Sequence, residues 1–327
     1  MKKEITSWIQ IGCASASTPE KRAGRVRSIV FGIGALVLLA GCALFTEGCG
    51  KPAVPPKPTD SRTWTAQCGN GVTMTLLRCP VNSPGDPDST TQDYYRPTRF
   101  LMGSVPSELG RTDRERLHWV VLTKQFWLGK YEVTQEQYEA VMGENPSGPR
   151  GKNLPVVNVT WSDAMAFCRK LTEKEKASGH LPEGYIYTLP TESQWEYACR
   201  AGMTTSLNNG KNLTDIGRCP NLDQVAWYIG NSGATIHTPG GKQPNGWGFY
   251  DMLGNVWEWC YDWYEGYPRE TITDPVGPPM SLVNWRIMRG GSCNNYADAC
   301  RCACRGFFEP YTHNEDRGFR LALLKED

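Results

Sequence analysis

The chain has 327 residues and a formal net charge of +1 at pH 7, because 35 Lys+Arg face 34 Asp+Glu. This balance argues against a nucleic-acid-binding protein, which usually carries a basic excess. With 34 Gly, 23 Pro and 12 Trp, the composition is typical of a loop-rich globular domain with an aromatic core, and it excludes a coiled coil or a repeat array. Thirteen cysteines without any C-x-x-C pair indicate an exported chain rather than a zinc protein.

The N-terminal part resembles an export signal. Residues 28–45 are an uninterrupted apolar run, and four basic residues precede it. The run ends in Leu39-Ala40-Gly41-Cys42, which resembles a bacterial lipobox and predicts cleavage before Cys42 and lipid attachment to Cys42. The alternative is an uncleaved transmembrane anchor, because the run is just long enough to span a bilayer. Both interpretations predict a membrane-anchored protein on the periplasmic or extracellular face.

The chain therefore divides into three predicted parts. Residues 1–42 are the signal and lipobox or a membrane anchor. Residues 43–63 contain the Pro-rich stretch GKPAVPPKPTDSR, which predicts an extended tether. Residues 64–327 are the predicted folded domain.

Within that domain the patterns predict short strands, then three helices, then irregular structure. GVTMTLL and HWVVLT alternate as strands do. Thr134 with Gln137, and Thr191 with Gln194, are capping boxes that begin helices. Residues 162–177 carry apolar residues at helical spacing, and residues 203–320 are rich in Gly, Asn and Trp. We expect a single α+β domain with a large loop content.

Seven segments in order carry a family resemblance. They are FLMGS at 100, KYEVTQEQYEAVMG at 130, PVVNVTWSDAMAFCRKL at 155, LPTESQWEYACRAG at 189, GWGFYDMLGNVWEWCYDWY at 246, RGGS at 289 and RGFRLAL at 317. Together they resemble the sulfatase-modifying-factor family, whose founding activity is formylglycine generation, over residues 68 to 325. The resemblance implies a single loop-rich domain similar to the C-type-lectin-like fold.

The resemblance also implies a calcium loop. Asp251 and Glu258 flank a Gly turn, and calcium prefers several oxygen ligands from carboxylates and backbone carbonyls. The match to the family implies Asp251 and Glu258 as side-chain ligands, and Gly254 and Val256 as carbonyl ligands. The alternative is that Asp251 caps a turn and Glu258 pairs with an arginine.

The copper site of the family's oxidases is not matched. Those enzymes hold copper(I) with two thiolates spaced C-x4-C after RGGS, and soft thiolates suit that metal. Here no C-x4-C occurs, and Asn295 falls where the first copper cysteine is expected. We therefore do not expect copper; a displaced pair of Cys293 and Cys300 is the alternative.

The remaining cysteines are expected to be structural. The resemblance implies a Cys199–Cys302 disulfide. Cys260 is a candidate partner for Cys300, and Cys68 and Cys79 flank a candidate hairpin. The alternative for each pair is two buried thiols. Ser292 and Trp257 match residues that line the family's substrate cleft, although core packing alone also accounts for a tryptophan.

These observations predict an exported, lipid-anchored family member that is a binding or scaffold module and not an oxidase. Its expected partners are a protein or peptide ligand in the cleft and the membrane, with no nucleic acid. The alternative is a formylglycine-generating oxidase that converts a sulfatase cysteine with copper and oxygen.

Overall fold

The computed structural model describes residues 62–82 and 98–326. The predicted anchor (1–42) and nearly all of the predicted tether (43–63) lie outside these residues. The described residues all fall in one compact unit. None of their helices is long and apolar enough to cross a membrane, and the apolar run 28–45 lies outside them.

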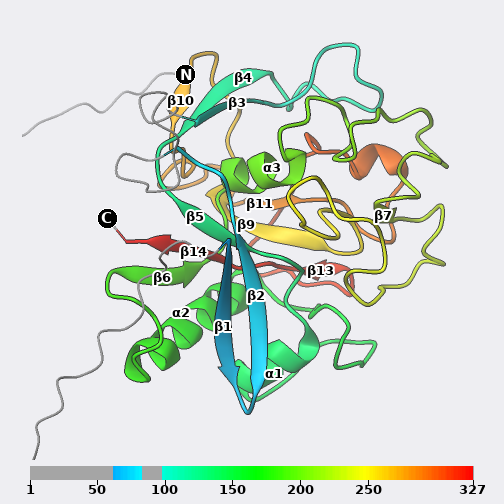
Figure 1. Cartoon of the computed structure of the whole chain (residues 1–327). Coiled ribbons are helices and arrows are strands. Elements are labelled where there is room, and N and C mark those ends of the chain that lie inside the picture. The colour runs from blue at the N-terminus through cyan, green and yellow to red at the C-terminus, as the bar shows by residue number, and fades with distance from the viewer. Residues whose placement is uncertain (1–61, 83–97, 327) are drawn as a thin grey trace, which may run out of the picture. The chain divides into compact units, whose positions relative to one another are not determined.

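Short strands and three helices make up the regular structure (Figure 1). The helices are α1 (Gln135–Met142), α2 (Trp161–Ala177) and α3 (Glu192–Arg200), with a 3-10 turn η1 (Ala297–Ala299). The strands are β1 (Thr63–Gly69), β2 (Val72–Arg78), β3 (Thr98–Met102), β4 (His118–Leu122), β5 (Phe126–Gly129), β6 (Tyr185–Thr188), β7 (Ala226–Trp227), β8 (Leu253–Gly254), β9 (Trp257–Trp263), β10 (Ile272–Thr273), β11 (Arg286–Arg289), β12 (Gly306–Phe308), β13 (Arg317–Gly318) and β14 (Ala322–Lys325).

The largest sheet joins the two ends of the domain. Its strand order is β1-β2-β5-β14-β6, so the C-terminal strand lies inside the sheet. Strand β14 pairs antiparallel with β5 and with β6, and Ala322 faces Leu128 on one side and Thr188 on the other. Because β14 forms hydrogen bonds with a strand on each side, residues Ala322–Lys325 are an integral part of this sheet.

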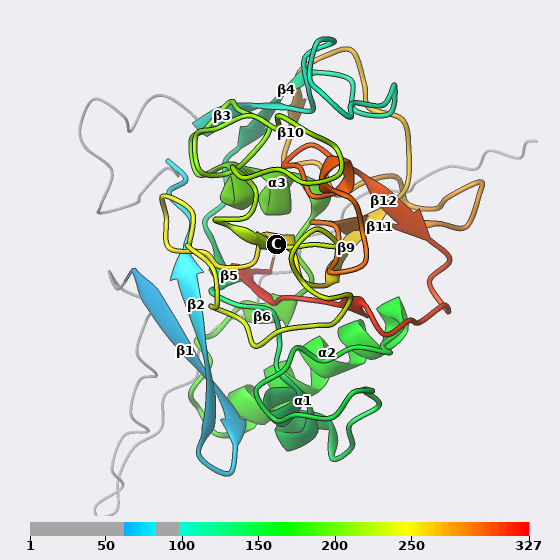
Figure 2. The same ribbon diagram turned by 90° about the vertical axis from the view of Figure 1, so that its right-hand side faces the viewer.

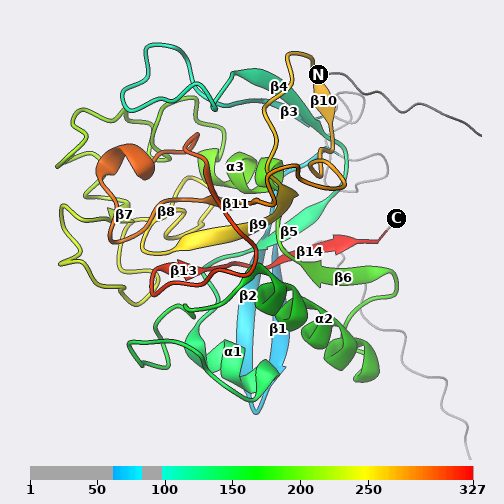
Figure 3. The same cartoon turned by 180° about the vertical axis from the view of Figure 1, so that it is seen from behind.

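All three predicted helices form. Thr134 and Thr191 are the predicted N-caps with complete capping boxes, and Thr160, which was not predicted, caps α2 in the same way. In α2 the four residues at helical spacing are buried, as the pattern predicts: Ala164, Phe167, Cys168 and Leu171. Figure 3 shows α1 and α2 on the same side of the β1–β2 hairpin, where the Tyr138 and Phe167 rings stack at 5.5 Å.

The site region is built from a second sheet and long irregular segments. Strands β12-β11-β9-β13 form this sheet, and α3 contacts β9 and β11. From residue 203 to 252 only the short β7 is regular. Figure 2 shows these segments as loops beside η1. The absence of long elements agrees with the Gly- and Asn-rich sequence.

Buried ion pairs hold α3 in place. Every residue of α3 is buried, including Glu192, Glu196 and Arg200. Arg289 of β11 is fully buried and pairs with Glu192 at 3.1 Å and with Glu196 at 2.5 Å. Arg305 also pairs with Glu192, through two hydrogen bonds of 2.7 and 2.8 Å. Burying a charge is costly unless it is paired, so these contacts explain how the charged residues of α3 can be buried.

The hairpin corrects one cysteine prediction. Its turn is Asn70-Gly71, both with positive φ, and Thr63 pairs with Leu77 at the open end. Cys68 therefore lies at the turn, whereas Cys79 lies beyond the open end. At about 3.3 Å per residue, the two are separated by roughly 20 Å, so the proposed Cys68–Cys79 closure of a hairpin is wrong.

Candidate functional site

The loop that begins at Asp251 contains a buried carboxylate oxygen without a partner. Asp251 is 2% exposed and has a φ of 51°. Its Oδ2 accepts a 2.6 Å hydrogen bond from the Gly240 amide, while its Oδ1 is buried and unpaired among the described residues. Burial raises the pKa of Asp251 to about 6. An orphaned anionic oxygen of this kind fits a bound cation.

A second carboxylate, Glu132, lies against the same loop and was missed in the sequence. Glu132 is 1% exposed. Its oxygens accept hydrogen bonds from Asn255 Nδ2 at 2.7 Å and from the Val256 amide at 3.2 Å. Burial, followed by the charges of Asp251 and Glu258, raises the pKa of Glu132 well above its usual range. Its place in the segment KYEVTQEQYEAVMG, which carries part of the family resemblance, was the signal available for it.

The structure corrects the role predicted for Glu258. Both of its oxygens accept hydrogen bonds from Arg320, at 2.6 and 2.5 Å, and Oε2 also accepts one from Trp195. Arg320 is itself fully buried. Because the guanidinium already neutralises this carboxylate, Glu258 serves as an arginine partner, which was the alternative interpretation, and not as a free calcium ligand.

The residues around the loop that begins at Asp251 meet some of the requirements of a cation site and not others. Three carboxyl groups, Glu132, Asp251 and Glu258, act on one another here, and the positive charges of Arg320 and Lys242 oppose them. In the described residues, however, no three His, Cys, Asp or Glu side chains converge as a metal-binding group. A cation here would rest on Asp251 and on backbone carbonyls, with those of Gly254 and Val256 as the predicted ligands. Gly254 has a φ of +77°, and a Cβ would lie 2.2 Å from the Trp227 carbonyl oxygen, so only glycine fits this turn.

Ser292 and Trp257 are brought together through Asp316. The Ser292 hydroxyl donates to Asp316 Oδ2 at 2.6 Å, and the Trp257 amide donates to the Asp316 carbonyl at 2.8 Å. Ser292 is fully buried and Trp257 is 7% exposed. The Trp257 ring packs against Phe308. Core packing, the alternative for Trp257, is therefore present, and a role in binding stays a prediction.

Asn295 completes this Ser292 cluster. Its Oδ1 accepts hydrogen bonds from the Ser292 amide at 3.0 Å and from the Ser292 hydroxyl at 2.8 Å. The side chain at the expected copper-cysteine position thus closes a turn. It does so with an oxygen, which is a poor ligand for a soft metal.

The displaced cysteine pair is buried. Cys293 is 1% exposed and packs with Val157, Ile236 and Val256. Cys300 is fully buried in the main core, with its sulfur 3.9 Å from the Ser292 carbonyl. Burial raises the pKa of Cys293 to about 12 and that of Cys300 well above its usual range. A thiol that binds a metal ion is deprotonated by that ion, so the displaced pair stays the alternative prediction.

The other predicted cysteine pairs have different outcomes. All cysteines of the described residues are free thiols. Cys199 and Cys302 lie side by side, with their sulfurs 3.7 Å apart, so the structure brings together the pair that the resemblance implied. Cys260 and Cys300 are both fully buried. No contact between their sulfurs is present in this part of the chain, and their pairing stays a prediction.

Sequence comparison places the chain in a family. The Sulfatase-modifying factor enzyme 1-like domain matches residues 96–325. The chain is 32% identical to the chaperone protein LppX of Paenibacillus barcinonensis, over 63% of this chain and 82% of that protein. It is 30% identical to the formylglycine-generating enzyme of Mus musculus, over 68% of this chain and 57% of the enzyme. The chain thus spans about half the length of the formylglycine-generating relatives.

Solved structures agree on the fold. The Treponema denticola variable protein 1 superposes with a TM-score of 0.65 at 28% identity, covering 80% of this chain and 99% of that one. PvdO from Pseudomonas aeruginosa superposes with a TM-score of 0.63 at 21% identity, covering 81% and 99%. The α+β architecture is therefore the C-type-lectin-like fold that the resemblance implied. On the family match and the fold together, the chain belongs to the sulfatase-modifying-factor family, with a domain like that of formylglycine-generating enzymes.

Proposed function

We propose that this domain is a binding or scaffold module of the family and not a copper oxidase, with a protein or peptide ligand held at the Ser292 cluster. Asn295 carries the proposal. Its oxygen satisfies Ser292 at the position where the oxidases hold a copper ligand. The two nearby cysteines, Cys293 and Cys300, are both buried free thiols. A relative named as a chaperone supports a non-oxidative role.

The oxidase remains the second candidate, because several relatives are formylglycine-generating enzymes. The test incubates the protein, loaded with copper(I), with a Cys-x-Pro-x-Arg peptide under oxygen, and weighs the product. We expect no aldehyde product, because the reaction needs two converging thiolates. Conversion that is abolished by Cys293→Ser or Cys300→Ser would establish the oxidase and remove the binding-module proposal.

Ligand binding itself is tested with the unreactive Ser-x-Pro-x-Arg peptide. If the family cleft binds peptides here, this probe quenches tryptophan fluorescence, and Trp257→Phe weakens its binding. Glu139→Gln, an exposed substitution on α1, is the matched control and leaves binding unchanged. A probe that binds wild type and Trp257→Phe equally would remove Trp257 from the ligand site.

We also propose that the domain is held at the membrane by a lipid on Cys42. The support is the basic and apolar run that ends in Leu39-Ala40-Gly41-Cys42. Wild-type protein expressed in a bacterial host should lose residues 1–41 and gain the mass of acyl groups, whereas Cys42→Ser should accumulate as the unprocessed precursor. Intact-mass spectrometry of the membrane fraction checks this, and a wild-type chain that retains residues 1–41 without acyl mass would disprove it.

A further inference from the structure

A cavity of about 170 Å³ lies at the far end of β9 from Trp257. It is bounded by β3 and β4, by the N-terminus of α3 and by the segment from Trp263 to Pro278. Because β9 has seven residues, the cavity and the Ser292 cluster are separated by roughly 20 Å. Sites for whole small molecules usually measure 300–1,000 Å³, so this volume suits a single side chain.

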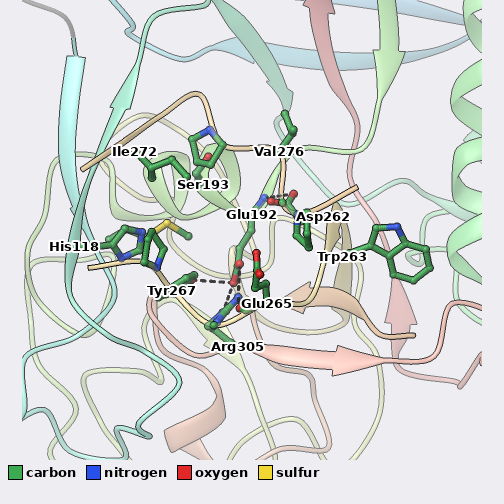
Figure 4. Close-up of a pocket in the computed structure, with 16 residues that line it drawn as sticks. His118, Glu192, Ser193, Asp262, Trp263, Glu265, Tyr267, Ile272, Val276 and Arg305 are labelled. Carbon is green, nitrogen blue, oxygen red and sulfur yellow. Dashed lines mark hydrogen bonds and ion pairs between the residues drawn. The ribbon is translucent and has the colours of Figure 1, made fainter. Parts of the chain in front are cut away.

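Asp262 supplies a buried carboxylate to this cavity. It is 5% exposed, and its Oδ2 accepts a 2.8 Å hydrogen bond from the Glu192 amide at the start of α3. Its own backbone amide is a second donor to the carboxylate. Because Asp262 lines the cavity, its carboxylate lies within reach of a side chain that enters there. Figure 4 shows Asp262 at the Glu192 backbone.

Glu192, the second acid of the cavity, is already fully engaged. Its carboxylate accepts two hydrogen bonds from Arg305, one from Arg289 at 3.1 Å and one from Tyr267 at 2.9 Å. Figure 4 shows Arg305 and Tyr267 converging on it. The positive charge of Arg305 is thereby neutralised by Glu192. Glu265 also lines the cavity and is exposed, so the free charge that faces the cavity is negative.

Apolar walls surround these acids. Ile272, Pro275, Val276 and Pro278 line one side, and this segment lies directly against Asp262. Gly277 makes the approach possible, because it has a φ of +74° and an added Cβ would lie 2.9 Å from the Asp262 Cβ. The walls offer no charged group, and they match the methylene stem of a long cationic side chain.

The rim extends the apolar surface beyond the cavity. Val276 is 56% exposed, and Met280, two residues after Pro278, is 69% exposed. Apolar side chains left in solvent next to a concave charged site are typical of surfaces that contact a polypeptide.

We propose that this cavity binds the cationic end of an arginine or lysine side chain of a polypeptide ligand, with Asp262 as the counter-ion. The stem packs between the proline-rich segment 275–278 and Tyr267, and Glu265 attracts the charge at the mouth. This site is distinct from the Ser292 cluster, so its failure would leave the proposed function of that cluster unaffected.

Burial, followed by the charge of Glu192, raises the pKa of Asp262 to about 8. The charged or titratable groups around Asp262 are Glu192 on α3, Arg305, Arg286 on β11 and Cys260 on β9, with His118, Glu265 and Tyr267 across the cavity. A cation binds the ionised carboxylate and displaces its proton. Its affinity therefore rises with pH up to about 8 and then levels off.

The probe is N-acetyl-arginine methylamide, titrated by calorimetry into the full domain between pH 6 and 9. We expect its Kd to fall about tenfold per pH unit from pH 6 to 7 and to become constant above pH 8. The isosteric citrulline derivative, which has no charge, should bind at least tenfold more weakly at pH 8.5. Equal binding of the two probes, or a Kd for the arginine probe that does not change with pH, would overturn the proposal without any protein variant.

Asp262→Asn removes the charge and keeps an oxygen for the Glu192 amide. It should weaken arginine binding at least tenfold at pH 8.5 and abolish its pH dependence. Glu265→Gln, at an exposed position, should weaken it a few-fold, while Glu139→Gln on α1 should have no effect. Unchanged binding by a folded Asp262→Asn variant would refute the assignment.

A further comparison separates a polypeptide ligand from a free cation. The affinity of acetyl-Leu-Arg-Leu-amide is compared with that of methylguanidinium, and equal affinity would exclude a polypeptide ligand.

Discussion

Replacing Arg289 by methionine should lower the free energy of unfolding by about 3–5 kcal/mol, the usual cost of breaking a buried ion pair from one side. Arg289 is fully buried, and it neutralises Glu192 and Glu196 and donates to the Cys302 carbonyl at 2.6 Å. Methionine fills a similar volume but cannot donate to the Glu192 and Glu196 oxygens or to the Cys302 carbonyl, although Arg305 still pairs with Glu192 and Arg200 with Glu196. Urea denaturation at neutral pH measures the loss.

Two further variants show whether charge is the cause. In Arg289→Met with Glu196→Gln, both partners of the Arg289–Glu196 ion pair are removed together, so the double variant should cost less than the sum of the single losses. Arg218→Met is the matched control, because the Arg218 side chain is 76% exposed, and it should stay within about 0.5 kcal/mol of wild type. A loss below about 1 kcal/mol for Arg289→Met would contradict the argument.

Local patterns predicted the helices and several strands well. Capping boxes are formed by residues three positions apart, so Thr134, Thr160 and Thr191 act as caps in whatever fold surrounds them. The alternation of apolar and polar residues is also a local pattern, and it identified β2 and β4. The Asn70-Gly71 turn is a local signal too, and reading it would have shown that Cys68 lies at the turn, away from Cys79.

Features that depend on distant partners could not be predicted. Glu258 and Arg320 are separated by 62 positions, and nothing near Glu258 in the sequence indicates that an arginine occupies its carboxylate. Glu192 is followed by polar and aromatic residues in a pattern typical of a half-exposed helix, yet all of α3 is buried because Arg289 and Arg305 reach it from β11 and from the segment after η1. Asp262 lines its cavity only because the 275–278 segment folds back over it.

Calcium should stabilise the domain through the loop that begins at Asp251. A ligand that binds only the folded state adds about 2.7 kcal/mol at a concentration one hundred times its Kd. For a domain of this size, that corresponds to a rise in Tm of about 5–10 °C. We therefore expect a chelator to lower the Tm of protein purified with calcium, and added calcium to restore it. Differential scanning calorimetry with and without chelator measures the difference.

The informative variant is Asp251→Asn, because the unpaired Oδ1 of Asp251 is the atom that a cation would satisfy, and the asparagine keeps an oxygen for the Gly240 amide. This variant should lose the response to calcium while remaining folded. Glu258→Ala is a poor test, since it leaves Arg320 buried without its carboxylate and should lower the Tm with or without calcium. A response to calcium that persists in Asp251→Asn would place the ion elsewhere. A wild-type Tm that does not change with chelator or calcium would show that the negative charge around Glu132 and Asp251 is relieved by bound protons instead, in agreement with the raised pKa of both groups.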